Sequence, residues 1–175
     1  MPEPVVIVDY DPAWPRRYEA LRAPIAAALG ELAAEIVHLG STSVPGLAAK
    51  PTIDIDVVLR SADDLPDAIR RLARLGYVHE GDLGIAGREA FATPPGYAVH
   101  DHHLYVCAPD WAGHGDQIAF RDWLRAHPKT ALAYARLKRS LAEKHRTDRA
   151  AYAGAKAGFV AAVLARARGL DKARA

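Results

Sequence analysis

The sequence predicts an α+β fold, with a mixed β-sheet in the first part of the chain and a helical bundle in the last part. Short β-branched or alternating apolar runs, separated by glycine- and proline-rich turns, occur up to about residue 107, whereas helical spacing dominates from residue 115 onward. The 175 residues suit about one domain. With 50% hydrophobic and 25% charged residues, the composition is that of a globular protein and excludes intrinsic disorder.

The N-terminal segment predicts a short strand followed by a helix. Val5–Val8 is a β-branched run typical of a strand. The run Asp11–Pro15 then supplies an N-cap residue and prolines close to a helix start. Helical spacing of apolar residues continues to about Leu29. Pro24 predicts a kink or a break in this helix, because proline lacks the amide hydrogen that the helix interior needs.

The next two strands flank a turn. Glu35–Leu39 is predicted to be a strand that ends at Gly40, and Gly40–Leu47 has turn composition with room for a short helical start. Ile53–Leu59 gives the strongest strand prediction because its residues alternate in character. The alternation places Ile53, Ile55 and Val57 on one face and Asp54, Asp56 and Val58 on the other.

One further helix and three further strands complete the predicted sheet region. Asp63 and Asp64 are expected to cap a helix that runs to about Leu75, where Gly76 ends it. The strands are expected at Tyr77–Glu80, Arg88–Ala92 and His103–Cys107.

From Gly115 the pattern is helical, and breaks at His127-Pro128 and around Thr147-Asp148 predict three helices. We treat residues 1–175 as one structural unit, with the sheet in residues 1–112 and the C-terminal helices in residues 113–175.

Several features predict a soluble cytoplasmic protein. No run approaches the roughly 18 apolar residues that span a bilayer. The start of the chain has neither the basic nor the apolar region of a secretory signal. The single cysteine, Cys107, cannot form an internal disulfide and is expected to be an inert core residue.

The charge is unevenly distributed along the chain. Residues 1–120 hold 9 lysines and arginines against 17 acids, whereas residues 121–175 hold 14 against 4. The two parts either complement each other, form a groove with one wall of each sign, or present solvated helix faces. Nucleic acid is not expected as a partner, because the front part is acidic and no nucleic-acid-binding motif is readable.

Asp54 and Asp56 form a candidate metal site. Side chains at positions i and i+2 of a strand project from the same face, so the two carboxylates repel unless a cation lies between them. Mg²⁺ is bound by one or two carboxylates together with substrate phosphates. The alternative is a pair of acids on a solvated strand.

Gly40 and Ser41 form a candidate phosphate site. A strand-ending turn presents backbone amides and a hydroxyl to an anion, and glycine lets the backbone approach it closely. Such a turn followed by the aspartate strand is the minimum apparatus for nucleotidyl transfer. Lys50 precedes that strand and could neutralise a triphosphate, or could be an exposed lysine.

At these residues the sequence resembles a known family. The run HLGSTSVPGLAAKPTIDIDVVL resembles the signature of the GrpB family, also called UPF0157. The segments DYDPAWPRRYEAL, HHLYVC and AFRDWLRAHPKTALAYARLKRSLAEKH are also similar to the family pattern. The resemblance covers nearly the whole chain. It implies a nucleotidyltransferase-like mixed sheet flanked by helices, with a C-terminal helical bundle, as in the superfamily of DNA polymerase β.

The resemblance implies a metal-dependent nucleotidyltransferase that moves a nucleotidyl group from a nucleoside triphosphate to an unknown acceptor. Gly40 and Ser41 match the residues that touch nucleotide phosphates. Asp54 and Asp56 match the first two catalytic carboxylates that hold Mg²⁺ or Mn²⁺.

The third carboxylate of the superfamily has no counterpart on the strand His103–Cys107. Asp101, Glu89 or His103 could take its place, and we include His103 in the candidate catalytic set. This departure favours a rival function, a nucleotide-binding or chaperone-like module without turnover. The family is similar to a domain fused to dephospho-CoA kinase in some bacteria, which makes that kinase a candidate partner.

The other polar candidates have simpler expectations. His100, His102 and His103 could supply a transition-metal ligand but are better placed to contact phosphate or base. The tryptophans are expected to pack rather than to stack on bases. Solvated positions are expected for the helix cations Arg121, Arg125, Lys138 and Arg139.

Overall fold

A computed structural model describes residues 4–93, 96 and 101–172 of the chain. Its centre is a five-stranded mixed sheet in the order β1-β2-β5-β4-β3. The central pair, β2 and β5, is parallel, and the other neighbours are antiparallel. The strands are β1 (Ala33–Leu39), β2 (Ile53–Leu59), β3 (Val78–Gly81), β4 (Arg88–Ala92) and β5 (His102–Cys107). These bounds confirm the predicted strands after residue 30.

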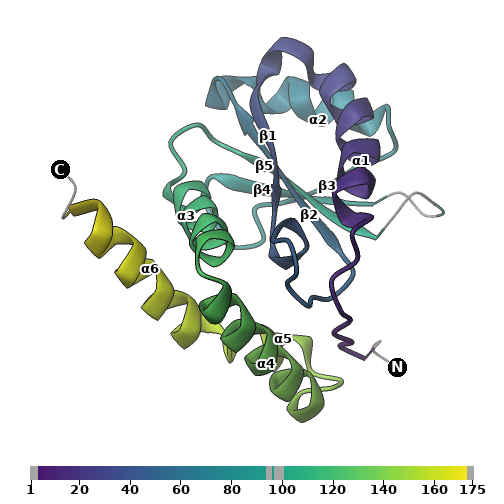
Figure 1. Ribbon diagram of the computed structural model, residues 1–175. Helices are drawn as coiled ribbons and strands as arrows, with labels where there is room; N and C mark the ends of the chain where they lie inside the picture. Colours follow the sequence, from purple (N-terminus) through teal and green to yellow (C-terminus); the bar gives the residue numbers. More distant parts are fainter. Residues whose placement is uncertain (1–3, 94–95, 97–100, 173–175) are drawn as a thin grey trace.

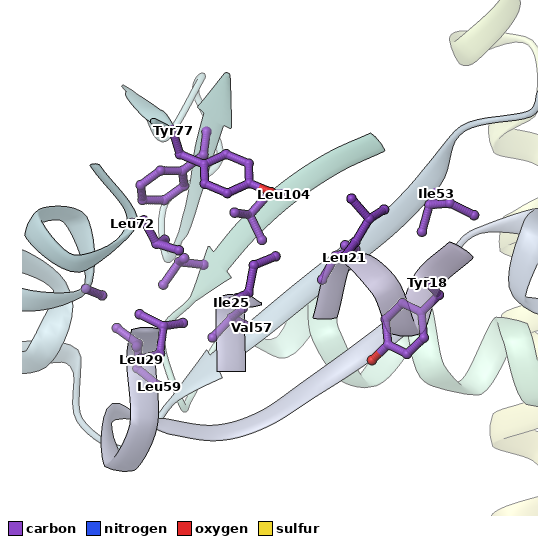
Figure 2. Packing of buried hydrophobic residues seen from close by; sticks show 14 of the residues in the cluster. Tyr18, Leu21, Ile25, Leu29, Ile53, Val57, Leu59, Leu72, Tyr77 and Leu104 are labelled. Atoms are coloured by element: carbon purple, nitrogen blue, oxygen red, sulfur yellow. The ribbon is translucent and has the colours of Figure 1, made fainter. Parts of the chain in front are cut away.

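Two helices, α1 (Trp14–Leu29) and α2 (Leu65–Ala73), cover one face of the sheet (Figure 1). The apolar face of β2 packs beneath them, as its alternation predicted, and forms the main core with Leu72 and Leu104 (Figure 2). From α1, Leu21, Ile25 and Leu29 are fully buried in this core. With one face of β2 committed to the core, Asp54 and Asp56 lie on the other face.

Two predictions for the N-terminal segment are wrong. Val5–Val8 forms no strand, and only Val8 makes an isolated bridge, to Ala49. Of the kink or break predicted at Pro24, the break is wrong, because α1 continues through this residue. Leu21 and Ile25 are both buried on its core face, so packing on either side of the proline holds the helix together against the local cost.

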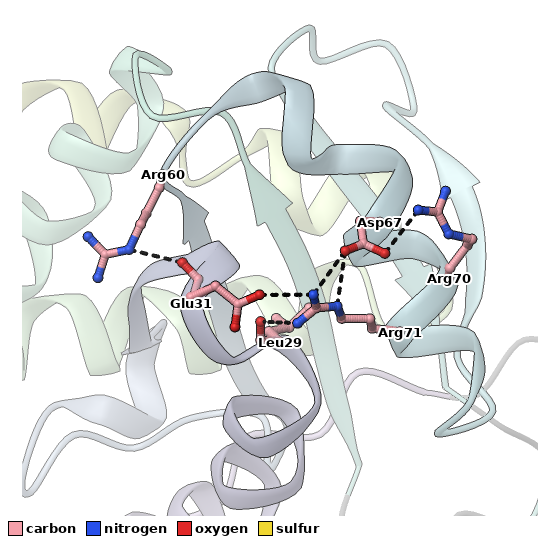
Figure 3. A network of polar contacts seen from close by, with 6 residues as sticks. All are labelled: Leu29, Glu31, Arg60, Asp67, Arg70 and Arg71. Atoms are coloured by element: carbon pink, nitrogen blue, oxygen red, sulfur yellow. Dashed lines mark hydrogen bonds and ion pairs between the residues drawn. The ribbon is translucent and has the colours of Figure 1, made fainter.

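The helix α2 begins after a 3-10 turn, η3 (Ala62–Asp64). The Ser61 side chain caps this turn by accepting a hydrogen bond from the Asp63 amide. Asp64 occupies the N-cap position of α2 but makes no side-chain capping bond, so the predicted capping by Asp63 and Asp64 is wrong. Arg71 of α2 donates to the carbonyl of Leu29 and pairs with Asp67 and Glu31 (Figure 3). These bonds join α2 to the end of α1.

The C-terminal part is helical, as predicted, but it divides into four helices within the described residues. They are α3 (Ala112–Ala126), α4 (Pro128–Lys144), α5 (Arg149–Gly154) and α6 (Ala157–Lys172). The predicted breaks are confirmed, with Pro128 in the first turn of α4 and the Asp148 side chain capping α5. An unpredicted break separates α5 from α6.

These helices lie away from the face that α1 and α2 cover (Figure 1). A second core cluster joins Leu124 of α3 and Tyr134 of α4 to Val44 and Leu47, which follow β1. The helical part therefore contacts the turn that precedes the aspartate strand. In the described part of the chain, no helix has the length and apolar character needed to cross a membrane.

Candidate functional site

The aspartate face of the sheet and the C-terminal helices enclose a pocket of about 300 Å³. The β2 residues Asp54 and Asp56 line it together with the Gly40–Ser41 turn, as the sequence predicted for one shared site. Other lining residues come from β4, β5 and the helices, namely Arg88, Tyr105, Gln117, Phe120, Arg121, Leu124, Tyr134 and Lys156. The pocket volume is at the lower end of the range for small-molecule sites.

Gly40 lies directly against Asp54. Its φ of +68° and ψ of −177° belong to a region that side chains rarely adopt. A Cβ atom at this position would lie 2.0 Å from Oδ2 of Asp54. Glycine is therefore required both by the backbone and by the neighbouring carboxylate.

The turn after Gly40 is fixed by side-chain hydrogen bonds. The Ser43 hydroxyl donates to the Gly40 carbonyl at 2.6 Å, and Thr42 Oγ1 donates to the Thr52 carbonyl at 3.3 Å. Arg125 of α3 donates to the Ser43 carbonyl through Nε at 3.1 Å and through Nη2 at 2.7 Å. Arg125 is therefore a structural clamp rather than a solvated cation, and Ser41 is held at the pocket wall.

Asp56 is almost completely buried, with 1% of its surface exposed. Burial raises its pKa to about 6, against the lowering effect of the nearby His114. The Cys107 thiol donates to Oδ2 of Asp56 at 3.7 Å. This carboxylate is costly to ionise in the protein alone, and a cation in the pocket would offset that cost.

His114 on α3 is a site residue that the sequence did not indicate. Its Nδ1 lies 3.6 Å from Asp56 Oδ2, and its Nε2 lies 3.5 Å from Glu35 Oε2. Both ring nitrogens are buried without a hydrogen bond. No motif marks this histidine, because only the packing of α3 against the sheet brings it to the carboxylate.

His103 lies beside Asp54, which confirms that the two share a face. The register pairs them across β5 and β2, and His103 Nδ1 lies 2.8 Å from Asp54 Oδ1. Nearly half of the His103 side chain is exposed.

Neither acid that could replace the third carboxylate, Glu89 or Asp101, lies with the aspartate pair of β2. Glu89 faces the opposite side of the sheet, since it pairs with Val106 of the core, and it bonds His79 at 2.7 Å. The Asp101 carboxylate accepts a hydrogen bond from Thr52 Oγ1 at 2.6 Å and does not line the pocket. On β5, the aspartate face carries His103 and Tyr105 instead. His102 is buried against Tyr77, and His100 lies outside the described residues.

The prediction of solvated helix cations is also wrong for Arg121 and Lys138. Arg121 lines the pocket and donates to the His38 carbonyl at 3.2 Å. Lys138 is 2% exposed and donates to the Ala48 carbonyl. Arg139 is exposed, as predicted, and pairs with the exposed Asp9.

Lys156, from the junction of α5 and α6, is a further cation that the sequence did not indicate. Its burial lowers its pKa, against the raising effect of Asp54, and the nearby charge of Lys50 lowers it further. Lys50 itself does not line the pocket. The pocket thus has carboxylates from the acidic part of the chain and cations from the basic part, together with Arg88 from β4.

The donor set suits a hard divalent cation only in part. Two carboxylates from adjacent same-face positions are a common protein contribution to Mg²⁺, with phosphate oxygens and waters filling the other positions. Within residues 4–93, 96 and 101–172, no group of three or more histidine, cysteine or acidic side chains is arranged to hold a metal ion. The residues therefore fit a metal that arrives with a phosphate ligand better than a preformed metal centre.

Solved structures share the fold. The crystal structure of the conserved protein GrpB from Enterococcus faecalis superposes with a TM-score of 0.83 and 31% identity, covering 93% of this chain and 96% of that one. A structure of the Cid1 poly(U) polymerase bound to MgATP superposes with a TM-score of 0.58 and 12% identity, covering 78% of this chain and 44% of that one. The second likeness shows that the fold is of the nucleotidyltransferase type.

Sequence comparison finds relatives that match most of this chain. A UPF0157 protein of Pseudomonas aeruginosa is 38% identical over 165 residues, which are 93% of this chain and 67% of that protein. A dephospho-CoA kinase of Mycolicibacterium paratuberculosis is 30% identical over 181 residues, covering 87% of this chain and 43% of the kinase. The family model described as GrpB protein matches residues 4–166. This chain therefore belongs to the GrpB family.

Proposed function

We propose that this protein is a metal-dependent nucleotidyltransferase, which moves a nucleotidyl group from a nucleoside triphosphate to an acceptor. The observation that carries the proposal is one pocket in which Asp54 and Asp56 adjoin the Gly40–Ser41 turn and in which Arg121 and Lys156 supply positive charge. Carboxylates that bind a metal, a turn that binds phosphate and cations that neutralise it are the requirements of this reaction.

The reaction balances as a displacement at the α-phosphorus. An acceptor oxygen or nitrogen forms a bond to that phosphorus, and the bond from it to the oxygen bridging the β-phosphate breaks. Pyrophosphate leaves with the bonding electron pair, and the acceptor's proton passes to a base.

Asp54 and Asp56 would hold Mg²⁺ or Mn²⁺, which when bound supplies Lewis-acid charge neutralisation at the phosphates. The Ser41 hydroxyl and the amides of its turn would bind the outer phosphates. Lys156 and Arg121 would offset the phosphate charge, with Lys50 contributing from a greater distance. These residues would hold the nucleotide before reaction and stabilise the pyrophosphate that leaves.

His103 is the candidate general base. Its Nδ1 contacts Asp54 at 2.8 Å, so a proton on Nδ1 is oriented by the carboxylate and leaves Nε2 as an acceptor. An imidazole held in this way can take the proton of an acceptor that lies within hydrogen-bond reach.

The absence of a carboxylate on the aspartate face of β5 favours one rival, a nucleotide-binding module without turnover. Such a module could assist a partner enzyme. A dephospho-CoA kinase is the candidate, because a similar segment occurs within kinases of that name.

Two measurements separate these functions. A nucleoside triphosphate with Mg²⁺ or Mn²⁺ should raise the melting temperature, since a ligand at a hundred times its Kd stabilises a protein by about 2.7 kcal/mol. The double variant Asp54→Asn/Asp56→Asn should lose this shift, and the exposed control Asp110→Asn should keep it. No shift with any of ATP, CTP, GTP or UTP would exclude nucleotide binding.

The second measurement tests turnover. Protein incubated with α-labelled triphosphates and a cell extract should produce metal-dependent labelling of an acceptor. Loss of the label in Asp54→Asn but not in Asp110→Asn supports the transferase. Nucleotide binding without any labelling supports the module.

A further inference from the structure

Arg88 of β4 lines the pocket but has no role in the proposed handling of the nucleotide. Its guanidinium lies over the Tyr105 ring, 4.2 Å from the centroid, and 5.8 Å from that of Trp111. The Trp111 ring packs directly on Gly113, where a Cβ would lie 2.3 Å from it. Aromatic rings therefore hold the Arg88 head group in one place.

The guanidinium has no anionic partner within the described part of the chain. Its Nε is buried without a hydrogen bond, and no ion pair joins Arg88 to another described residue. A guanidinium donor that is removed from water and left unpaired is costly. The planar donors of arginine match the paired oxygens of a phosphate or carboxylate group. An oxyanion from outside the protein is the partner that this position lacks.

The sheet order places Arg88 on the side of the aspartates opposite the Gly40–Ser41 turn. Gly40 adjoins Asp54 from the β1 side, whereas Tyr105 and Arg88 follow on β5 and β4 in the other direction. Each strand step is about 4.8 Å, so Arg88 lies roughly 10 Å across the sheet from β2. The attacking and leaving groups of phosphoryl transfer lie roughly in line. If pyrophosphate leaves toward Ser41, the acceptor approaches from the side of Arg88.

We infer that Arg88, held over Tyr105, binds an oxyanion carried by the acceptor. The acceptor class is then a molecule with a phosphate or carboxylate group near the hydroxyl or amine that receives the nucleotidyl group. The assignment to the acceptor rests on the proposed function, whereas the oxyanion site itself rests only on the surroundings of Arg88.

The test is calorimetric titration of the full chain with inorganic phosphate and, separately, with acetate. Each titration is run without nucleotide and again with Mg²⁺ and a triphosphate analogue whose bridge between the α- and β-phosphates cannot be cleaved. Arg88→Gln is compared with Arg136→Gln, which removes the same charge from an exposed position on α4. Circular dichroism checks that each variant is folded.

At least one of the two anions should bind the nucleotide-loaded protein. Arg88→Gln should weaken this binding by about tenfold or more, because a charge-assisted contact is lost. Arg136→Gln should leave it unchanged, and Arg88→Gln should leave nucleotide affinity unchanged. If Arg88→Gln does not fold, Arg88→Lys replaces it, and the loss of the planar fork should still weaken binding several-fold.

Failure of the inference and failure of the proposed function give different results. Absence of anion binding under both conditions, or equal binding by wild type and the Arg88 variant, overturns the oxyanion site. If the nucleotide does not bind, the proposed function fails. An anion site that is lost in Arg88→Gln and kept in Arg136→Gln would then still support the oxyanion site.

Discussion

The contact between Gly40 and Asp54 predicts a specific cost for adding a single methyl group to the chain. In Gly40→Ala, the new Cβ would lie 2.0 Å from Oδ2, 2.9 Å from Cγ and 3.2 Å from Cβ of Asp54. Gly46 provides a matched control, because its φ is also positive, at +78°, and a Cβ there would meet nothing within 4 Å. Both variants strain the backbone, but only Gly40→Ala collides with a carboxylate.

The magnitude follows from these two terms. The backbone region of Gly40 costs a non-glycine residue about 1–3 kcal/mol, and a positive φ at Gly46 costs about 1–2 kcal/mol. Turning Asp54 away from its rotamer adds about 0.5–1.5 kcal/mol. We expect Gly40→Ala to lower the free energy of unfolding by roughly 2–4 kcal/mol, and Gly46→Ala by about 1–2 kcal/mol.

Urea unfolding of the two variants, of Asp54→Ala and of the double variant Gly40→Ala/Asp54→Ala measures these terms. Truncating Asp54 removes the two closest atoms, so the double variant should be more stable than the sum of its single effects by about 1–2 kcal/mol. Equal effects of Gly40→Ala and Gly46→Ala, or additivity within about 0.5 kcal/mol in the double variant, would refute the steric reasoning.

Three further predictions concern buried side chains. Burial lowers the pKa of Lys138 from 10.5 to about 7, so the unfolded chain binds more protons than the folded protein between these values. Stability relative to Lys138→Met should therefore rise from pH 7 to pH 10, by at most roughly 4 kcal/mol at about 1.4 kcal/mol per pH unit. Urea unfolding that shows no rise would contradict this. Ile25→Ala should cost about 2–5 kcal/mol by cavity formation, whereas Leu132→Ala, at a position that is 53% exposed, should cost little in the same assay. Burial, reinforced by the charge of Asp56, raises the pKa of the Cys107 thiol. A thiol reagent at pH 8 should therefore label Cys107 only in unfolded protein. Rapid labelling of the native protein would contradict this expectation.

Much of the sheet could be predicted from the sequence because alternation along a strand is a local property. The pattern of Ile53–Leu59 predicted both the strand and the shared face of its two aspartates. The turn at Gly40 was readable from its glycine and hydroxyl residues, and it gained meaning only together with the aspartate strand that follows. Family resemblance and local chemistry pointed to the same residues here.

The errors arose where long-range packing overrides local preference. Val5–Val8 has strand propensity but no neighbouring strand to pair with, apart from a single bridge. Pro24 should disturb a helix, yet the buried residues Leu21 and Ile25 keep α1 intact. The lysine at position 138 looked solvated, and the fold buries it against the Ala48 carbonyl.

The sequence by itself determined the aspartate pair, the Gly40–Ser41 turn beside it and the family to which the chain belongs. The tertiary structure alone decided what surrounds that pair. Glu89 and Arg88 are adjacent in the chain, and only the register of β4 against β5 sends the acid to the core face and the arginine to the pocket. His114 and Lys156 likewise reach the site through the packing of helices that are distant in sequence. A strand's alternation is fixed by its own residues, but its face and its neighbours depend on contacts that no local pattern encodes.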